Sequence, residues 1–184
     1  MKNLFFNFCA FALLVFAMTT NANAQNNKPA PSPSSKVTQM VGLTEITVEY
    51  SRPSVKGRTI FAKDGLQAYG VAWRTGANAA NKFTFSTEVT INGTKLPAGA
   101  YTMTTVPGAD EWTVNIYKYD GTNSGAYAQK KADASFMAKS MKLGEVKVET
   151  FLIDINNITD TSAVINLVWE NTAVSIPFEV PKTW

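Results

Sequence analysis

Apolar and polar residues alternate one by one through short segments along most of this chain. In the stretch from Thr44 to Tyr50, the side chains of Ile46, Val48 and Tyr50 would point to one side of an extended backbone. A period of two predicts a β-strand that is buried on one face, because an α-helix would need apolar residues every three or four positions. The same alternation recurs in residues 82–87, 112–118, 150–155, 163–169 and 174–180.

Turn residues separate these segments at the spacing of β-hairpins. The dipeptide Asn92-Gly93 lies between residues 89–91 and 94–96, and Asn-Gly tolerates the positive φ angles of a type I′ turn. A second turn sequence, Pro107 to Asp110, separates two further extended segments. Both patterns predict that neighbouring strands run antiparallel.

Two segments are less regular. Residues 126–141 are rich in alanine and would suit a short helix, or a loop followed by a strand over Ala134–Lys139, and the pattern favours the second interpretation. Pro177 lies inside the last alternating segment and has no N–H to donate. The last strand is therefore predicted to be an edge strand, or to point its proline outward.

Eight to ten short strands without a long helix predict an all-β fold, an antiparallel β-sandwich of jelly-roll-like type or an open barrel. Disorder of the whole chain is excluded, because 45% of its residues are hydrophobic and only 17% are charged. The residues predicted in or beside the core are Ile46, Val48, Phe83, Phe85, Tyr101, Trp112, Val114, Ile116, Ile165, Leu167, Trp169, Ile176 and Phe178.

The first 24 residues have the order of a secretory signal peptide. Lys2 is followed by an apolar run of about 15 residues and then by Ala22-Asn23-Ala24, a small-x-small cleavage sequence. An uncleaved anchor is the alternative, but the run is shorter than the roughly 20 residues that cross a bilayer. We therefore expect a secreted or periplasmic protein that starts at Gln25 and has no membrane span after cleavage. Residues 25–35 would be a Pro/Ser-rich linker, and residues 36–184 a single domain.

The composition excludes several kinds of chemistry. The chain has no histidine, and its single cysteine, Cys9, lies in the apolar run near the start. A Ser-His-Asp triad, a histidine-containing zinc site and a cysteine metal cluster are therefore excluded, and we expect neither a metal nor a cofactor. The net charge of +3 is too small to predict binding to nucleic acid.

The three arginines of the chain, Arg52, Arg58 and Arg74, all lie in the stretch from Tyr50 to Asn81, whereas lysines are spread throughout. Arginine is favoured where a planar fork grips a carboxylate or phosphate. Loops of about 30 residues are uncommon inside compact domains and are often functional. The predicted ligand-binding cluster is Tyr50, Arg52, Lys56, Arg58, Trp73, Arg74 and Asn78, and the expected ligand is a small anionic or carbohydrate-like molecule.

A structural role for the same residues is the alternative. Arginines in long loops often bond to backbone carbonyls, and Glu45, Glu49 or Asp64 could pair with them. Trp73 does not follow the strand period, so it could be either a surface stacking platform or a buried anchor of the loop.

A hydrolase that uses carboxylates or a tyrosine is a further possibility, as is a purely structural protein of the cell envelope. Glu45 and Glu49 would lie about 13 Å apart along one strand face, too far for the roughly 5–9.5 Å of a glycosidase pair. The lack of histidine, the commonest acid-base residue near neutral pH, favours a binding module or a structural protein over an enzyme.

Several longer motifs resemble those of one family. Residues 50–58 read YSRPSVKGR and residues 73–78 read WRTGAN, followed by LPAGAY at 96–101 and EWT at 111–113. These sequences are similar to the secreted bacterial family known as domain of unknown function 2911, frequent in Bacteroidetes-type bacteria. The resemblance implies a secreted or periplasmic all-β domain and supplies no activity. One departure is Ser124, which stands where relatives tend to have the tryptophan of a Trp-Gly-x-Tyr sequence, so a pocket lined by that tryptophan would be altered here.

Overall fold

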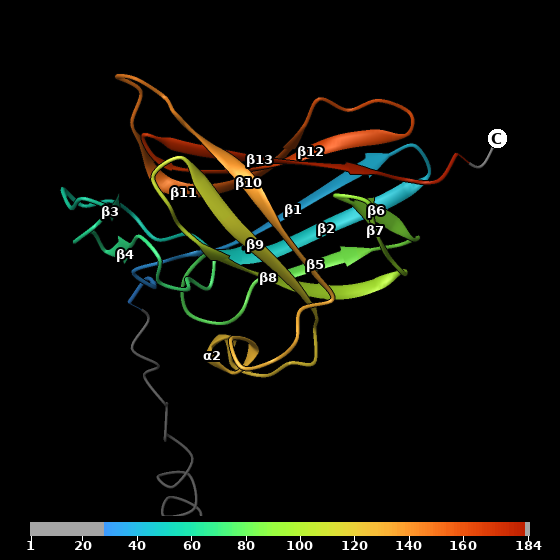
Figure 1. Cartoon of the computed structure of the whole chain (residues 1–184), viewed down its shortest axis with the longest axis horizontal. Coiled ribbons are helices and arrows are strands. Elements are labelled where there is room, and N and C mark those ends of the chain that lie inside the picture. Colours follow the sequence, from blue (N-terminus) through green and yellow to red (C-terminus); the bar gives the residue numbers. More distant parts are fainter. Residues whose placement is uncertain (1–27, 183–184) are drawn as a thin grey trace, which may run out of the picture. The chain divides into compact units, whose positions relative to one another are not determined.

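The computed structural model describes residues 28–182, and almost all regular structure within this range is β-strand (Figure 1). The predicted signal peptide (1–24) and the start at Gln25 lie outside the described residues. Within the described range, no helix is both long enough and apolar enough to cross a membrane. The predicted all-β fold is confirmed.

Residues 28–182 contain thirteen strands and one short helix. They are β1 (Ser34–Val41), β2 (Thr44–Ser51), β3 (Phe61–Ala62), β4 (Gln67–Ala68), β5 (Lys82–Phe85), β6 (Val89–Ile91), β7 (Thr94–Leu96), β8 (Gly99–Val106), β9 (Glu111–Lys118), α2 (Ser124–Tyr127), β10 (Ala134–Lys142), β11 (Val148–Asn156), β12 (Ser162–Glu170) and β13 (Thr172–Glu179). The number exceeds the predicted eight to ten, since strands of two residues such as β3 and β4 are too short to show an alternating pattern. β1 begins two residues before the predicted start of the domain.

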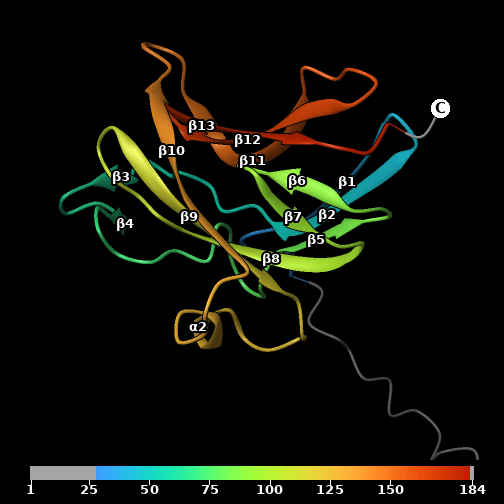
Figure 2. The same cartoon turned by 45° about the vertical axis from the view of Figure 1, so that its right-hand side comes forward.

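The main sheet has the strand order β1-β2-β5-β8-β9-β10-β13-β12-β11, with β6 paired to the end of β13 and to β7. After β10, the strands follow in the reverse of their chain order: β13 lies beside β10, then β12, then β11. This arrangement, in which the fourth strand returns beside the first, is a Greek key. Figures 1 and 2 show β11, β12 and β13 crossing over the other strands as a second layer. The small β3–β4 pair lies at one end of the layers, and β6 and β7 lie at the other.

One strand, β10, belongs to both layers. Its first part, Ala134–Lys139, pairs with β9, and its second part, Ser140–Lys142, pairs with β13. The sheet therefore bends across β10 without a break in the strand. β10 also decides between the two interpretations of residues 126–141. A strand that begins at Ala134 confirms the favoured one, a loop followed by a strand, and the helical structure of this region is limited to the one turn of α2.

The predicted turns are confirmed. Asn92 and Gly93 have φ angles of 47° and 77°, and they join β6 to β7 in an antiparallel hairpin. β8 and β9 form the second hairpin around residues 107–110. Pro177 is exposed on the outer face of β13, which is an interior strand of the sheet, so of the two alternatives its outward orientation is the correct one.

The core lies between the two layers, and every predicted core residue is buried. Toward the end that carries β3 and β4, the core is mainly aromatic. Trp73 stacks on Trp169 with ring centroids 5.6 Å apart, while Phe61 and Trp112 are 4.6 Å apart. This aromatic cluster forms the base on which the arginine-containing loop rests.

Candidate functional site

The loop of residues 52–81 begins by pairing with the free edge of β11. Val55 N–H donates to the carbonyl of Glu149 at 2.8 Å, and Phe151 N–H donates to the carbonyl of Pro53 at 2.9 Å. A bridge between Ser54 and Thr150 completes this short antiparallel contact. The segment after β2 thus crosses to the opposite edge of the sheet and nearly closes it at this end.

Two residues of the predicted cluster continue this closure with their side chains. The Tyr50 hydroxyl accepts a hydrogen bond from Ile153 N–H at 2.9 Å and donates to the carbonyl of Ile153 at 3.3 Å. Arg52 Nε donates to the carbonyl of Phe151 at 2.8 Å. Tyr50 is 5% exposed, so its hydroxyl serves the edge of β11 rather than the solvent. These bonds from Tyr50 and Arg52 to the backbone are the contacts expected if both residues have a structural role.

Arg58 follows a tight turn at Lys56-Gly57, whose φ angles of 49° and 70° are both positive. Its Nε donates to the carbonyl of Val55 at 2.9 Å and its Nη2 to the carbonyl of Ser54 at 2.6 Å. The guanidinium is thus held along one edge, and its remaining N–H groups make no hydrogen bond within residues 28–182. Lys56 is exposed on the turn itself.

Arg74 is held in a similar way, since its Nη1 donates to the carbonyl of Asn78 at 2.9 Å. The Asn78 side chain in turn donates to the carbonyl of Ser32 at 3.1 Å. Both Asn78 and the β-branched Thr75 have positive φ angles, 58° and 52°. Backbone strain of this kind costs about 1–3 kcal/mol per residue and is concentrated at functional sites in proteins.

Trp73 is the buried anchor of the loop and not a surface platform. Its side chain is 3% exposed, and its indole N–H donates to the carbonyl of Gly76 at 3.0 Å. Its backbone exchanges two hydrogen bonds with Thr105 of β8, at 2.7 and 2.9 Å. The rigid core therefore fixes the position of its neighbour, Arg74.

Asn81 was not identified from the sequence, although it holds the loop more extensively than any predicted residue. Its buried amide nitrogen lies within hydrogen-bond distance of the carbonyls of Arg74, Thr75 and Met103, at 2.8–3.1 Å. Its amide oxygen accepts from Met103 N–H at 2.8 Å and from the Thr102 hydroxyl at 3.2 Å. No sequence pattern marks this role, because asparagine is equally common in exposed turns.

Four of the seven predicted residues line one open cleft of about 330 Å³. We call it the arginine cleft, and the predicted residues that line it are Arg58, Trp73, Arg74 and Asn78. Gln67 adds an amide, and none of the described residues that line it is Asp or Glu. The ion pairs within residues 28–182 all involve lysine, and Glu49 pairs with Lys82. Tyr50, Arg52 and Lys56 do not line the arginine cleft.

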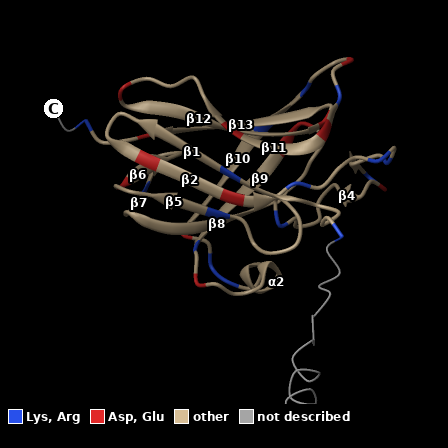
Figure 3. Ribbon diagram, turned by 180° about the vertical axis from the view of Figure 1, so that it is seen from behind, with Lys and Arg blue, Asp and Glu red and all other residues tan. Residues whose placement is uncertain are grey.

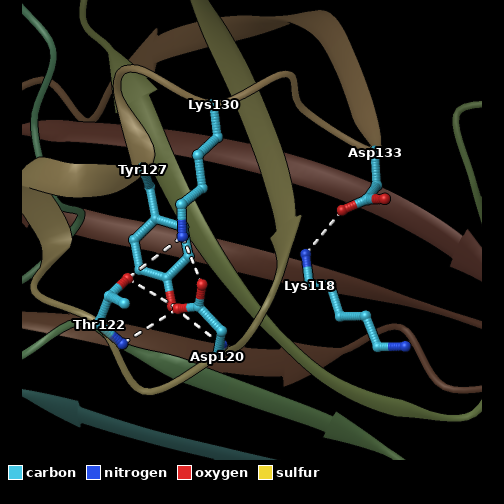
Figure 4. Close-up of polar contacts among 6 residues, drawn as sticks. All are labelled: Lys118, Asp120, Thr122, Tyr127, Lys130 and Asp133. Atoms are coloured by element: carbon cyan, nitrogen blue, oxygen red, sulfur yellow. Dashed lines mark hydrogen bonds and ion pairs between the residues drawn. The ribbon is translucent and has the colours of Figure 1, made fainter.

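A second polar cluster holds the loop before β10 (Figure 4). The Asp120 carboxylate accepts hydrogen bonds from Lys130, from the Thr122 hydroxyl and from the hydroxyl of the fully buried Tyr127. These bonds, that from Lys130 first, hold the pKa of the Asp120 carboxyl well below its usual range. Ser124, at the position of the altered motif, is buried nearby in α2 and does not line the arginine cleft.

A family model described as "Protein of unknown function (DUF2911)" matches residues 32–178. That range covers the strands from β1 into β13 and includes the whole loop that forms the arginine cleft. No curated protein and no solved structure matches the chain.

Proposed function

The chain belongs to the DUF2911 family, which is described without an activity, and from this premise we propose a function on the chain's own geometry. The protein is a binding module without catalysis of its own, and its ligand is a small anionic molecule such as a sugar acid. The binding site is the arginine cleft. The observation that carries the proposal is that Arg58 and Arg74 line one cleft to which no Asp or Glu of residues 28–182 contributes.

The two guanidiniums are suited to anion binding because they are already oriented. Each is fixed by backbone carbonyls along part of its edge, which lowers the entropy that a ligand must remove on binding. Each keeps further N–H groups for a planar, two-point contact with a carboxylate. The cleft volume of about 330 Å³ lies within the usual range of small-molecule sites, about 300–1,000 Å³.

A purely structural role is the competing proposal, and one observation favours it. All three arginines donate to backbone carbonyls, as loop-anchoring arginines do. The two roles make different demands on Arg74, because anchoring matters with or without a ligand whereas recognition matters only with one. A catalytic role has less support, since none of the described residues that line the cleft is a carboxylate and the chain has no histidine.

The test compares Arg74→Lys with Arg52→Lys, a matched change in the same loop but outside the cleft. Binding is measured by calorimetry with galacturonate, inorganic phosphate and neutral galactose, and stability by thermal melting. Arg74→Lys should weaken binding of galacturonate about 10- to 100-fold, since charge-assisted hydrogen bonds contribute about 1.5–3 kcal/mol. Arg52→Lys should lower the melting temperature and leave affinity unchanged. The structural alternative prevails if no probe binds the wild type and Arg74→Lys lowers the melting temperature.

Export is part of the proposal. The order of Lys2, apolar run and Ala22-Asn23-Ala24 supports a chain that is cleaved before Gln25 and acts in the periplasm or outside the cell. N-terminal sequencing of the folded, exported protein tests this, and an intact Met1 would contradict it.

A further inference from the structure

A second cleft, of about 480 Å³, lies over the outer face of β1, β2 and β5. We call it the sheet cleft; its charged members are Lys36, Glu49 and Lys82, and its aromatic members are Tyr50 and Tyr119. Lys36 lies directly across from Glu49 in the β1–β2 register, and Glu49 lies across from Lys82 in the β2–β5 register. The three side chains thus form a row across three strands, with two positive charges and one negative charge.

The polar groups of the sheet cleft are only loosely engaged. Lys82 Nζ is 3.4 Å from Glu49 Oε2 and 5.9 Å from the centre of the Tyr119 ring. An ion pair this exposed contributes little stability, about 0–1 kcal/mol. The hydroxyls of Ser34, Ser51 and Tyr119 make no hydrogen bond within residues 28–182. The cleft therefore offers hydroxyl donors and acceptors beside a row of two lysines and one glutamate, whose net charge is positive.

Neighbouring residues of the same two segments line the two clefts. Ser32, Ala77 and Asn78 border the arginine cleft, whereas the nearby Ala79 and Ala80, with Ser34 and Ser35, border the sheet cleft. The hydrogen bond from the Asn78 side chain to the carbonyl of Ser32 ties these two segments together. The clefts consequently lie on either side of the contact between Asn78 and Ser32, which we call the seam. In Figure 3, ribbon segments coloured blue for Lys and Arg occur both on the strands around β2 and in the loops near β4.

We propose that the two clefts form one continuous binding surface for an acidic oligosaccharide. This inference rests on the proposed function, because the arginine cleft is taken as the subsite for one uronic acid. A chain of sugar acids would continue across the seam and place a second carboxylate near Lys36 and Lys82. The ring of Tyr119 would then offer an apolar face to a sugar ring, as aromatic side chains with a polar tip do at wet interfaces.

The wall chemistry favours a saccharide over an acidic peptide. Beyond the charged groups, the walls present the Gln67 and Asn78 amides and the hydroxyls of Ser34, Ser51 and Tyr119. These groups match the dense hydroxyls of a sugar chain. An extended peptide would instead gain most from a free strand edge and from apolar pockets for alternate side chains. The sheet cleft covers strand faces, and the backbone groups of its central strand, β2, are already paired on both sides, with β1 and with β5.

The experiment measures affinity against chain length, with galacturonate and its oligomers of two to six residues as probes. Calorimetry is done with the wild type, Arg74→Lys and Lys82→Gln, and with Lys118→Gln as a control for loss of one positive charge outside both clefts. Thermal melting verifies that each variant is folded. We expect the affinity of the wild type to rise at least about tenfold from monomer to tetramer, because each tenfold gain requires about 1.4 kcal/mol of added contact.

Lys82→Gln should remove most of this length-dependent gain and leave monomer affinity unchanged, whereas Arg74→Lys should weaken every length. Lys118→Gln should change neither. Affinity that does not rise with length, or a gain that survives Lys82→Gln, overturns the continuous surface while monomer binding preserves the proposed function. Failure of every length to bind overturns both. An acidic hexaglutamate peptide that binds more tightly than the hexamer, and loses affinity in Lys82→Gln, would replace the saccharide with a peptide partner.

Discussion

Replacing Tyr50 with phenylalanine should destabilise the protein by about 2–3 kcal/mol. The change removes only a hydroxyl, yet that hydroxyl bonds to both the N–H and the carbonyl of Ile153, which is fully buried. A buried polar group left without a partner costs about 1–3 kcal/mol. The carbonyl bond is long, at 3.3 Å, so we count the loss as one full penalty and part of a second.

The measurement is urea unfolding of the chain from Gln25, followed by fluorescence. For a domain of this size, a loss of 1 kcal/mol lowers the melting temperature by about 2–4 °C, so thermal melting should show a decrease of about 5–10 °C. Tyr69→Phe is the matched control, because the Tyr69 hydroxyl makes no hydrogen bond within residues 28–182. If Tyr50→Phe unfolds within about 0.5 kcal/mol of the wild type, the side-chain closure of β11 has no energetic importance.

Two further predictions concern other polar anchors. Asn81→Ala should lower the free energy of unfolding in urea by at least about 3 kcal/mol, because it leaves the buried Met103 N–H and several carbonyls unpaired. Asn115→Ala, at a half-buried asparagine, is the control. Equal losses of stability in the two variants would contradict the argument. The folded-state pKa of Asp120 is lowered, so its stabilising contribution is present above the unfolded pKa of about 3.9 and is lost as the pH falls below it. The melting temperature of the wild type should therefore decline more steeply from pH 5 to pH 2 than that of Asp120→Asn, and parallel curves would refute this.

The strands and the core could be predicted because their signal is local. Period-two alternation marks β2, β9, β12 and β13 directly, and Asn92-Gly93 encodes its own turn. The crossing of residues 53–55 to β11 could not be predicted, because it joins positions about 100 residues apart and uses backbone groups that every residue has.

For the arginine-containing loop too, part of the arrangement could be predicted from the sequence and part could not. The restriction of Arg52, Arg58 and Arg74 to one stretch of the sequence predicted that they lie in a ligand-binding cluster. In the structure, two of them line one cleft. The sequence could not distinguish Arg52, which bonds to the edge of β11, from the other two, because all three carry the same side chain in the same kind of loop. Trp73 lay outside the strand period because it pairs through an isolated bridge with β8.

The strand that belongs to both layers has a consequence for how the domain opens. Since β10 hydrogen-bonds to β9 through one half and to β13 through the other, neither layer can separate from the remaining structure without disturbing a strand of its neighbour. Unfolding is then expected to be a single cooperative event rather than the stepwise loss of two sheets. In native-state hydrogen exchange, the slowest amides of β9 and of β12 should become exchangeable through one common opening, with the same dependence on denaturant.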